Sequence, residues 1–532
     1  MNKSRRAFLW RAALAAPLLL SETPRGAEAS SRVDVRARGA KGDGRTKDTN
    51  ALQSAIDAAA ASGLTVHFPP GEYLSGTLRL RDRTALYLDA GATLIASPDD
   101  ADFDRPEALD YETFADRETS DYGFALLRGR RLRHVRILGP GRIDGNRTSR
   151  SGPKLIALKE CADVEIRDLT IANAGSYNVS LLGCQRVNVQ DVTILNGYAD
   201  GIDPDCCRDV RIARCNIDTR DDALCLKASF ALGTRVSTEN VRVSGCRLTT
   251  LHNAIKLGTE STGDFRNIAI SDCAITGRRH PWKGDLTSGI ALETVDGGIL
   301  ERVSIWNIQM ADVRAPIFVR RAGRGRGQRA PIPGALRDVS IRDVRARGAL
   351  LASSITGIPG HPVERIALRN VRAIARGGGS ADLTSLRVPE MRRRYPDAAM
   401  FADLPAYGLY CRHVVGLTVE DTDLAFDRSD ARPAVVLDDV SDVRVDALQA
   451  STAVGTGPML WLHAVRDGRF RDLRPRAGGK TVARISGAAT ARMHVFRRDL
   501  DQVVLLDRDV SASALQVDGR PVAPGRTATA WP

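Results

Sequence analysis

The sequence lacks three features that would assign it quickly to a common class of protein. Beyond its first twenty residues it has no apolar run of the roughly 20 residues that span a membrane. Its basic residues form neither a block nor a stripe flanked by aromatic residues, which make up only 5% of the chain. Its nine cysteines include a Cys206-Cys207 doublet but no CxxC spacing. These absences argue against a transmembrane protein, a nucleic-acid-binding protein and a cysteine-based metal site.

The positive charge of the chain is spread along it. The formal net charge is +13, and about +10 remains when the first 29 residues, with five basic and two acidic groups, are set aside. A diffuse positive field fits a polyanionic substrate such as a uronate polymer better than it fits nucleic acid. We therefore expect no nucleic-acid partner.

The first 29 residues resemble a twin-arginine export signal. They contain Arg5-Arg6, an apolar run to Leu20 and the small-x-small site Ala27-Glu28-Ala29. A membrane anchor is the alternative, but Arg11 interrupts the apolar run, which is about half the length of a membrane span. We expect residues 1–29 to be removed, which leaves a periplasmic or secreted protein without membrane contact.

A short triplet of the form apolar-x-apolar recurs along the chain and predicts its fold. Each triplet is too short to form a stable strand alone, and a repeat of this size without helical periodicity indicates a right-handed parallel β-helix. The steps between triplets range from 23 to 51 residues, and the excess over 23 indicates loops. Those at 278–286, 321–334 and 376–412 are candidate cleft walls. The triplets begin at Val135, Val164, Val187, Val210, Val241, Ile268, Val303, Val339, Ile366, Leu417 and Val443.

Six cysteines support the same register. Cys161, Cys184 and Cys207 each precede a triplet by three residues, and another set follows the start of a triplet by five: Cys215, Cys246 and Cys273. Stacked coils lie about 4.8 Å apart, which leaves disulfides open, although buried unpaired thiols are favoured. With nine cysteines, at least one thiol must stay unpaired.

The segments on either side of the triplets differ from them in composition and pattern. Asp48-Thr49 is a predicted N-cap for a helix from about Asn50 to Ala61 that Gly63 ends, with strands at Thr65–Phe68 and Ala85–Leu88. Such a helix would cover the open end of a β-helix. The predicted divisions are the signal (1–29), an N-terminal cap (30–97), the β-helix (98–450) and further coils, a cap or a small β appendage (451–532).

Aligning the coils by their inward apolar residues predicts a polar outer strip on one face. One inward column is Val179, Ile202, Leu224, Ile255, Ile290 and Ile317, and the next is Leu181, Pro204, Leu226, Leu257, Leu292 and Val319. The outer strip and its edge then contain Asn178, Ser180, Asp200, Asp203, Asp221, Asp222, Cys225, Lys227, His252, Lys256, Ala291, Glu293 and Arg320. Asp200 and Asp222 each precede an inward residue by two positions, so we expect them to be neighbours.

Asp200, Asp221 and Asp222 are suited to cleaving a glycosidic bond with inversion. This reaction needs a protonated acid on the leaving oxygen and a carboxylate that holds water on the other face, about 6.5–9.5 Å away. Crowded carboxylates raise one pKa and retain one proton. Aspartates at turns are alternatively structural, because they satisfy backbone N–H groups. Because the doublet Asp221-Asp222 faces a third carboxylate, that of Asp200, we favour the catalytic interpretation over the structural one.

Around these residues the chain resembles the polygalacturonases and rhamnogalacturonan hydrolases of glycoside hydrolase family 28, which have a pectin-lyase-like solenoid. The resemblance rests on Val33–Gly63, on the GIDPD context and on the spacing from Asp200 to Asp221-Asp222, and it covers about residues 33–320. It implies that Asp221 is the general acid and that Asp200 and Asp222 position and activate water. It also implies a pectic substrate with galacturonosyl linkages and no cofactor or metal.

Three motifs of that family are altered here. Tyr198-Ala199 replaces Asn-Thr, Leu251-His252-Asn253 stands in place of Gly-His-Gly, and Ala291-Leu292-Glu293 stands where Arg-Ile-Lys is expected. The family's Arg and Lys grip the substrate carboxylate, which a Glu would repel. Lys227 and Lys256 are candidates to supply the missing charge, although Lys256 is equally expected to pair with Asp203 or Glu293. The candidate substrate-binding residues are His252, Asn253, Lys227, Lys256, Asn178, Asp203, Glu293 and Arg320, with Arg321 as a further candidate.

Two other functions stay open at this point. A lyase on the same fold would use Lys227 or Lys256 as a base beside an acidic Ca²⁺ site, and a non-catalytic β-helix would only bind carbohydrate. We favour an O-glycosyl hydrolase that acts on homogalacturonan or rhamnogalacturonan, as a monomer with a pectic polysaccharide or oligosaccharide as its partner.

Overall fold

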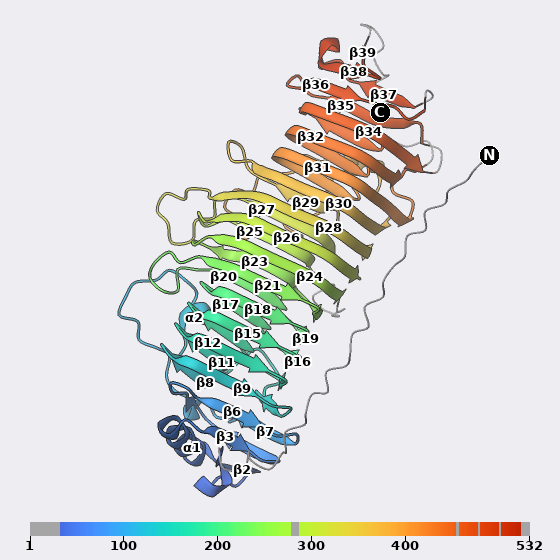
Figure 1. The fold of residues 1–532 in the computed structure, drawn as a ribbon. Coiled ribbons are helices and arrows are strands. Elements are labelled where there is room, and N and C mark those ends of the chain that lie inside the picture. Colours follow the sequence, from blue (N-terminus) through green and yellow to red (C-terminus); the bar gives the residue numbers. More distant parts are fainter. Residues whose placement is uncertain (1–31, 278–286, 454–456, 477–478, 500–501, 523–532) are drawn as a thin grey trace, which may run out of the picture.

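A computed structural model describes residues 32–277, 287–453, 457–476, 479–499 and 502–522, which form a right-handed parallel β-helix. The strands stack along one axis from the blue N-terminal end to the red C-terminal end (Figure 1). The predicted signal at 1–29 and the predicted cleft wall at 278–286 lie outside the described residues. Within those residues, no helix is long and apolar enough to cross a membrane.

Each coil contributes strands to three parallel sheets, because the peptide groups of such short strands find partners only in the coils above and below. We call the sheet that carries the candidate site the wall sheet. It contains β5 (Leu78–Arg79), β8 (Ala125–Arg130), β11 (Lys154–Lys159), β14 (Val179–Leu182), β17 (Ile202–Asp205), β20 (Leu224–Ala228), β23 (Asn253–Ser261), β25 (Ser288–Thr294), β27 (Ala315–Arg321), β29 (Ser353–Thr356), β33 (Leu460–His463), β35 (Thr481–Ser486) and β37 (Val503–Leu506).

The triplets form the second sheet, and a third sheet closes the coil. The triplet sheet contains β1 (Arg32–Asp34), β3 (Thr65–Phe68), β6 (Ala85–Leu88), β9 (Arg133–Leu138), β12 (Ala162–Arg167), β15 (Gln185–Gln190), β18 (Arg208–Ala213), β21 (Thr238–Ser244), β36 (Ala491–Val495), β38 (Leu515–Val517) and the antiparallel β39 (Arg520–Pro521). The third sheet contains β2 (Asp43–Lys47), β4 (Gly71–Ser75), β7 (Ala92–Ala96), β10 (Arg142–Asp144), β13 (Thr170–Ala172), β16 (Thr193–Gly197), β19 (Asn216–Thr219) and β22 (Arg247–Thr250).

In the C-terminal half, longer strands run through more than one sheet. They are β24 (Phe265–Gly277), β26 (Ile299–Ala311), β28 (Ala335–Ala349), β30 (Val363–Gly377), β31 (Leu409–Arg428), β32 (Val435–Ser451) and β34 (Arg466–Arg476). Parallel pairing continues beyond residue 451, from β32 to β34 to β36 to β38, so the segment that follows the last triplet forms further coils.

The register agrees with the triplet alignment at every step. Each triplet pairs with the next along the chain, from Val135 with Val164 to Leu417 with Val443. The inward column of the wall sheet is also confirmed, because Ile202 pairs with Leu224 and Leu224 with Ile255. These apolar residues are buried and form one continuous core.

The N-terminal helix α1 (Thr49–Ser62) has nearly the predicted bounds, but its N-terminus differs from the prediction. The carboxylate of Asp48 makes no capping bond and instead accepts hydrogen bonds from the backbone of Lys41 and Gly42, at 2.7 and 2.9 Å. Asp48 therefore holds the preceding glycine-rich loop. Gly63 ends the helix with a left-handed φ of 70°, which glycine adopts without steric cost.

The remaining helices in the described part of the chain are short. They are α2 (Arg117–Ser120) and the 3₁₀ turns η2 (Arg36–Arg38), η3 (Asp100–Asp102), η4 (Ala381–Ser385) and η5 (Ala512–Ala514). All nine cysteines lie in the described residues, and each is a buried free thiol. The two cysteine ladders therefore pack as small apolar side chains.

Candidate active site

The three candidate acids meet at the start of β17 and β20 on the wall sheet. Asp200 and Asp222 precede the paired residues Ile202 and Leu224 by two positions each, and the backbone N–H of Gly201 donates to the Asp222 carbonyl at 2.9 Å. The expected neighbour relation is thus confirmed. Many turn aspartates of this chain, such as Asp191, adopt a left-handed φ, whereas these three do not. Their backbone geometry therefore differs from that of the structural turn aspartates.

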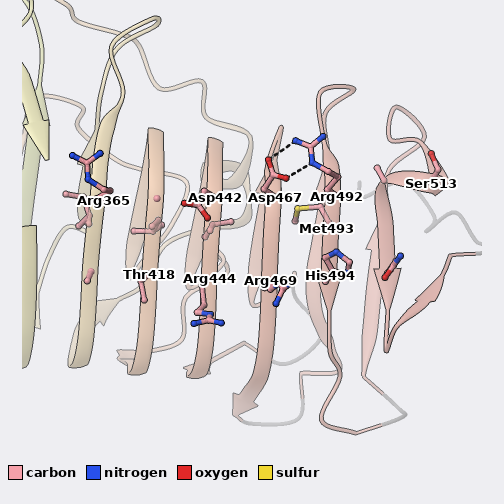
Figure 2. A pocket seen from close by; sticks show the side chains of 17 residues that line it. Arg365, Thr418, Asp442, Arg444, Asp467, Arg469, Arg492, Met493, His494 and Ser513 are labelled. Atoms are coloured by element: carbon pink, nitrogen blue, oxygen red, sulfur yellow. Dashed lines mark hydrogen bonds and ion pairs between the residues drawn. The ribbon is translucent and has the colours of Figure 1, made fainter. Parts of the chain in front are cut away.

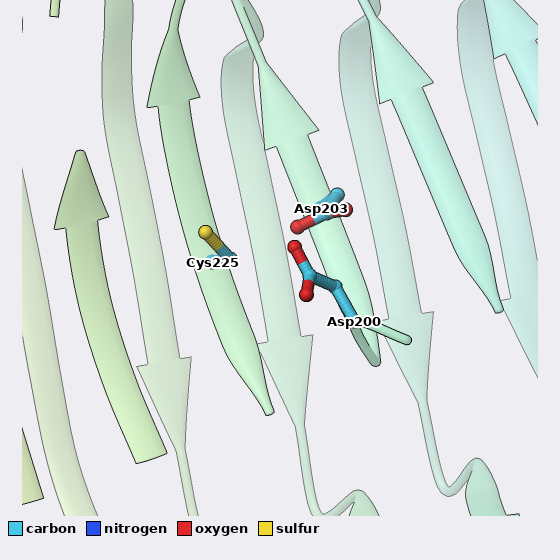
Figure 3. A group of neighbouring side chains, drawn as sticks. All are labelled: Asp200, Asp203 and Cys225. Carbon is cyan, nitrogen blue, oxygen red and sulfur yellow. The ribbon is translucent and has the colours of Figure 1, made fainter. Parts of the chain in front are cut away.

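Asp200 and Asp203 share one lysine in the interior of the wall. The Nζ of Lys227 lies 2.9 Å from Asp200, 3.3 Å from Asp203 and 3.0 Å from the hydroxyl of Tyr177. Figure 3 shows the two carboxylates directed toward each other beside Cys225, a grouping that could suit a metal ion. Because the ammonium of Lys227 already contacts both carboxylates, a cation of the protein itself balances their charge.

Burial controls the protonation of this pair. It raises the pKa of Asp200 well above the usual range, and the charge of Asp203 adds to the effect. Burial likewise raises the pKa of Asp203 to about 7, although Lys227 opposes it. The crowded carboxylates thus retain a proton as expected, but the structure places it on the Asp200–Asp203 pair.

Asp222 is held by a second set of donors. Its Oδ1 accepts from the backbone N–H of Asn253 at 3.0 Å and from Nδ2 of the same residue at 2.7 Å. Its Oδ2 lies 2.8 Å from the Nζ of Lys256, which also donates to Tyr395 at 3.3 Å. The expectation that Lys256 pairs with Asp203 or Glu293 was wrong, because the carboxylate of Asp222 is nearer.

Asp221 is the most accessible of the three carboxylates, with 19% of its side chain exposed. Arg150 donates to its Oδ2, and Nδ1 of His252 lies 3.9 Å from its Oδ1. Burial raises the pKa of Asp221, but His252 and Arg150 outweigh burial and lower the pKa to about 2. Without a ligand, Asp221 is therefore an ionised carboxylate at the accessible edge of the site.

Glu293 does not act as the repulsive charge that the sequence suggested. Its side chain is 1% exposed, and its Oε2 has no hydrogen-bond partner among the described residues. Burial raises the pKa of Glu293 to about 8, against the attraction of Lys256. At neutral pH the carboxyl is protonated, so it carries no charge that would repel a uronate.

Replacing Glu293 by glutamine should flatten the pH dependence of stability. A carboxyl whose folded pKa is about 8 and whose ordinary value is 4.5 stabilises the fold below about pH 4.5 and loses this contribution as the pH rises through 8. The loss for the wild type between pH 5 and 9 is on the order of 4 kcal/mol, and glutamine should remove it. Urea unfolding at pH 5, 7 and 9 measures this.

The control for that measurement is Glu165→Gln, whose carboxylate forms an exposed ion pair with Arg167 on the triplet sheet. We expect that variant to follow the wild-type pH profile. Equal pH slopes for the wild type and Glu293→Gln would contradict the assignment of a buried, neutral Glu293.

Other candidate substrate-binding residues are buried. Asn178 is fully buried and donates to the Asp200 carbonyl at 2.9 Å. Arg320 is 1% exposed and donates to Oγ1 of Thr356 and to the carbonyls of Gly357 and Glu390, and Arg321 donates to the carbonyl of Pro362. These side chains support the wall and the loop above it. His252, with a 40% exposed side chain, remains open to a substrate.

Two loops bring further residues to the wall. Tyr395, which is 53% exposed, comes from the insertion at 376–412 and reaches Lys256. Arg324 and Arg326, from the insertion at 321–334, form ion pairs with Asp296 and Asp116. Both insertions therefore fold against the wall sheet and its loops, as expected for cleft walls.

The β-helix also has cavities outside the cluster of candidate acids. A hollow of about 820 Å³ between β30 and η5 contains none of the candidate residues, and the Asp467–Arg492 ion pair forms part of its lining (Figure 2). A cavity of about 1,070 Å³ lies farther along the wall sheet, beside Tyr410 and Trp461. A smaller one, of about 440 Å³, is lined by Glu118 and Lys154 and adjoins the candidate acids through Arg150.

Sequence reasoning did not find Arg150, Glu118, Tyr177 or Tyr395. Tyr177 lies directly before Asn178 in the aligned strip, so its column could have been read from the repeat. Arg150, Glu118 and Tyr395 lie in loops whose path no strand period determines.

Comparisons with known proteins agree with this architecture. The family described as "Glycosyl hydrolases family 28" matches residues 109–384, and one described as "Rhamnogalacturonase A/epimerase, pectate lyase-like" matches residues 32–105. A probable polygalacturonase of Vitis vinifera is 26% identical over 375 residues, which cover 65% of this chain and 74% of that protein. An endo-polygalacturonase of Pectobacterium carotovorum subsp. carotovorum is 23% identical over 51% of this chain and 71% of that protein.

The solved structure of a hyperthermoactive exopolygalacturonase from Thermotoga maritima shares the fold. It has a TM-score of 0.56 and 19% identity, and the match covers 65% of this chain and 87% of that one. The first family match alone spans more than half of the sequence. The chain therefore belongs to glycosyl hydrolase family 28 and is an O-glycosyl hydrolase.

Proposed function

We propose that this enzyme hydrolyses galacturonosyl linkages of homogalacturonan or rhamnogalacturonan with inversion at the anomeric carbon. The observation that carries the proposal is the carboxylate cluster on the wall sheet of a family 28 chain: an accessible Asp221 beside the buried Asp200 and Asp222. The relatives named above act on polygalacturonate by their descriptions, and the positive net charge of this chain suits a polyanion.

In the proposed reaction, protonated Asp221 gives its proton to the glycosidic oxygen as the bond to the anomeric carbon breaks. Water attacks that carbon from the opposite face and passes a proton to the carboxylate pair. Asp222 is the acceptor we propose, since Asn253 and Lys256 fix its orientation, and Asp200 lies on the adjacent coil. A carboxylate oxygen of Asp222 lies within 4.8 Å of one of Asp221, closer than the roughly 6.5–9.5 Å expected from the sequence, so the water must enter beside the pair and not between them. The proposed reaction requires no cofactor or metal.

A lyase reaction on the same wall is less suited to these side chains. Burial alone would lower the pKa of Lys227 and Lys256, but their ion pairs with Asp200 and Asp222 raise both well above the usual value. Each ammonium thus keeps its proton and cannot take another from a uronate ring.

Product analysis tests the proposal. Oligosaccharides of homogalacturonan and of rhamnogalacturonan, incubated in H₂¹⁸O, should yield products with one ¹⁸O at the new reducing end and no ultraviolet-absorbing unsaturated end. Nuclear magnetic resonance of the first-formed anomer should show inversion. An unsaturated product would establish a lyase, a retained anomer would refute the assigned roles, and binding without cleavage would refute hydrolysis of these polymers.

The N-terminal segment supports a proposal about location. We propose that the Arg5-Arg6 signal exports the folded enzyme to the periplasm or beyond. There it would meet pectic fragments as a monomer. Replacing Arg5-Arg6 by Lys-Lys should retain the enzyme in the cytoplasm, which fractionation of the cells measures.

A further inference from the structure

Arg150 is a partly exposed guanidinium that contacts the candidate general acid directly. It lies in the turn between β10 and β11, and its side chain is 46% exposed. Its Nη1 donates to Asp221, and its Nη2 donates to both carboxylate oxygens of Glu118, at 3.0 and 2.9 Å. Arg150 thus bridges the candidate acid and an anchoring carboxylate on α2.

Three other candidate cations of the wall are not available in this way. Lys227, Lys256 and Arg320 are each at most 5% exposed, and each already donates to carboxylates or carbonyls. The sequence also has Ala291 and Glu293 at the positions where a cationic pair was expected. Recognition of a uronate carboxylate therefore requires a cation from elsewhere, and Arg150 both reaches solvent and contacts the acid cluster.

The surroundings of this bridge can receive a charged sugar. Glu118 lines the cavity of about 440 Å³, together with Arg117 and Lys154. The Nζ of Lys154 is buried without a hydrogen-bond partner among the described residues and lies 4.0 Å from the ring centre of Tyr122. A uronate beside Arg150 would thus lie next to a cavity lined by Arg117 and Asp121, and by Lys154, whose pKa burial lowers to about 7.

We propose that Arg150 is the uronate-specificity residue of this enzyme, and that its Nη1 exchanges Asp221 for the carboxylate of the bound sugar while Nη2 stays on Glu118. The inference rests on the function proposed above and identifies the residue that recognises the substrate charge. The exchange replaces one charge-assisted hydrogen bond by another and forms no covalent bond.

The same exchange prepares Asp221 to act as an acid. The groups that lower its pKa in the free enzyme are His252, Arg150 and Lys256, whereas Asp200 and Asp222 are its neighbouring carboxyl groups. When Arg150 turns to the substrate, it lowers the pKa of Asp221 less strongly. Burial and the two neighbouring carboxyl groups then raise that pKa. The carboxyl then takes a proton from water, so a charged sugar activates the acid and a neutral sugar does not.

Selectivity between charged and neutral substrates tests the proposal. Arg150→Gln should lower kcat/KM on galacturonate oligosaccharides by about 10–100-fold, since it removes a hydrogen bond between two charged groups. On the methyl-esterified oligosaccharides it should cause no loss. Arg150→Lys should recover little, because an ammonium cannot bridge two carboxylates as a guanidinium does.

The pH dependence gives a second readout. The pH profile of kcat/KM reports the free enzyme, and the pH profile of kcat reports the enzyme–substrate complex. In the wild type, the alkaline limb of the kcat profile should therefore lie at higher pH than the alkaline limb of the kcat/KM profile. In Arg150→Gln the two limbs should approach each other, because the free enzyme no longer holds Asp221 ionised.

A matched control is Arg186→Gln, an exposed arginine with a bidentate pair to Asp163 on the triplet sheet, which should leave both readouts unchanged. An equal loss on charged and esterified substrates would overturn the proposal, because it would indicate a structural role. If the wild type cleaves neither substrate, the proposed function fails. If it cleaves the uronate and the selectivity of Arg150→Gln is unchanged, only the role of Arg150 fails.

Discussion

Replacement of Asp221 by asparagine is expected to lower kcat by about 10²–10⁴-fold, the contribution typical of a general acid. Asparagine has nearly the same shape but no proton to give to the leaving oxygen. The side chain is 19% exposed and lies beside Arg150 and His252, so the coil stack should tolerate the change. Initial rates on galacturonate oligosaccharides, with circular dichroism and the urea midpoint as checks on folding, measure the effect.

The control for Asp221→Asn is Asp209→Asn. Asp209 is the second residue of β18, has a left-handed φ of 58° and accepts a hydrogen bond from Asn240. Asparagine tolerates that conformation, so activity and stability should both stay near the wild-type values. Activity of Asp221→Asn within threefold of the wild type would remove Asp221 from the mechanism and leave the Asp200–Asp203 pair, which retains a proton, as the next candidate for the acid.

The fold could be predicted because the sequence pattern that determines it is local and recurs in every coil. Each coil places an apolar residue of the triplet inward, and a shift by one residue would turn the whole set to solvent. One register therefore satisfies all coils from Val135 to Val443, and it fixes the neighbour relation of Asp200 and Asp222 as well. The cap helix followed from its alanine-rich stretch and from Gly63, whose left-handed backbone ends it.

The contacts of the site could be predicted only in part, because they depend on distances that no period encodes. The alignment places Lys256 on the strip but does not say whether its four-carbon chain reaches Asp222, Asp203 or Glu293. The charge of Glu293 was misjudged for a related reason, since burial decides its protonation and the sequence does not show burial of a polar side chain. Arg150 and Tyr395 arrive from loops, so only the structure places them.

Replacement of Lys227 by methionine is expected to lower the free energy of unfolding by roughly 3–5 kcal/mol at neutral pH, the cost of leaving buried charges without their partner. Lys227 is 4% exposed and joins Asp200, Asp203 and Tyr177. Methionine fills a similar volume but offers no charge. The variant should also lose activity, because Asp200 would hold its proton more tightly and could not help to activate water. Urea unfolding and initial rates measure both effects.

The pH dependence of this defect separates lost charge from lost packing. The folded pKa of Asp203 is about 7, above its ordinary 3.8, so this carboxyl stabilises the fold below about pH 4 and loses that contribution as the pH rises through 7. Without Lys227 both carboxyls should stay protonated to still higher pH, and the defect should therefore be small at pH 4 and grow toward pH 8. The double variant Lys227→Met/Asp203→Asn should recover part of the stability at pH 8. Lys47→Met, which removes an exposed partner of Asp102, should leave the urea midpoint near the wild-type value. A defect of equal size at pH 4 and pH 8 would mean that the methylene chain of Lys227, and not its charge, holds this part of the wall together.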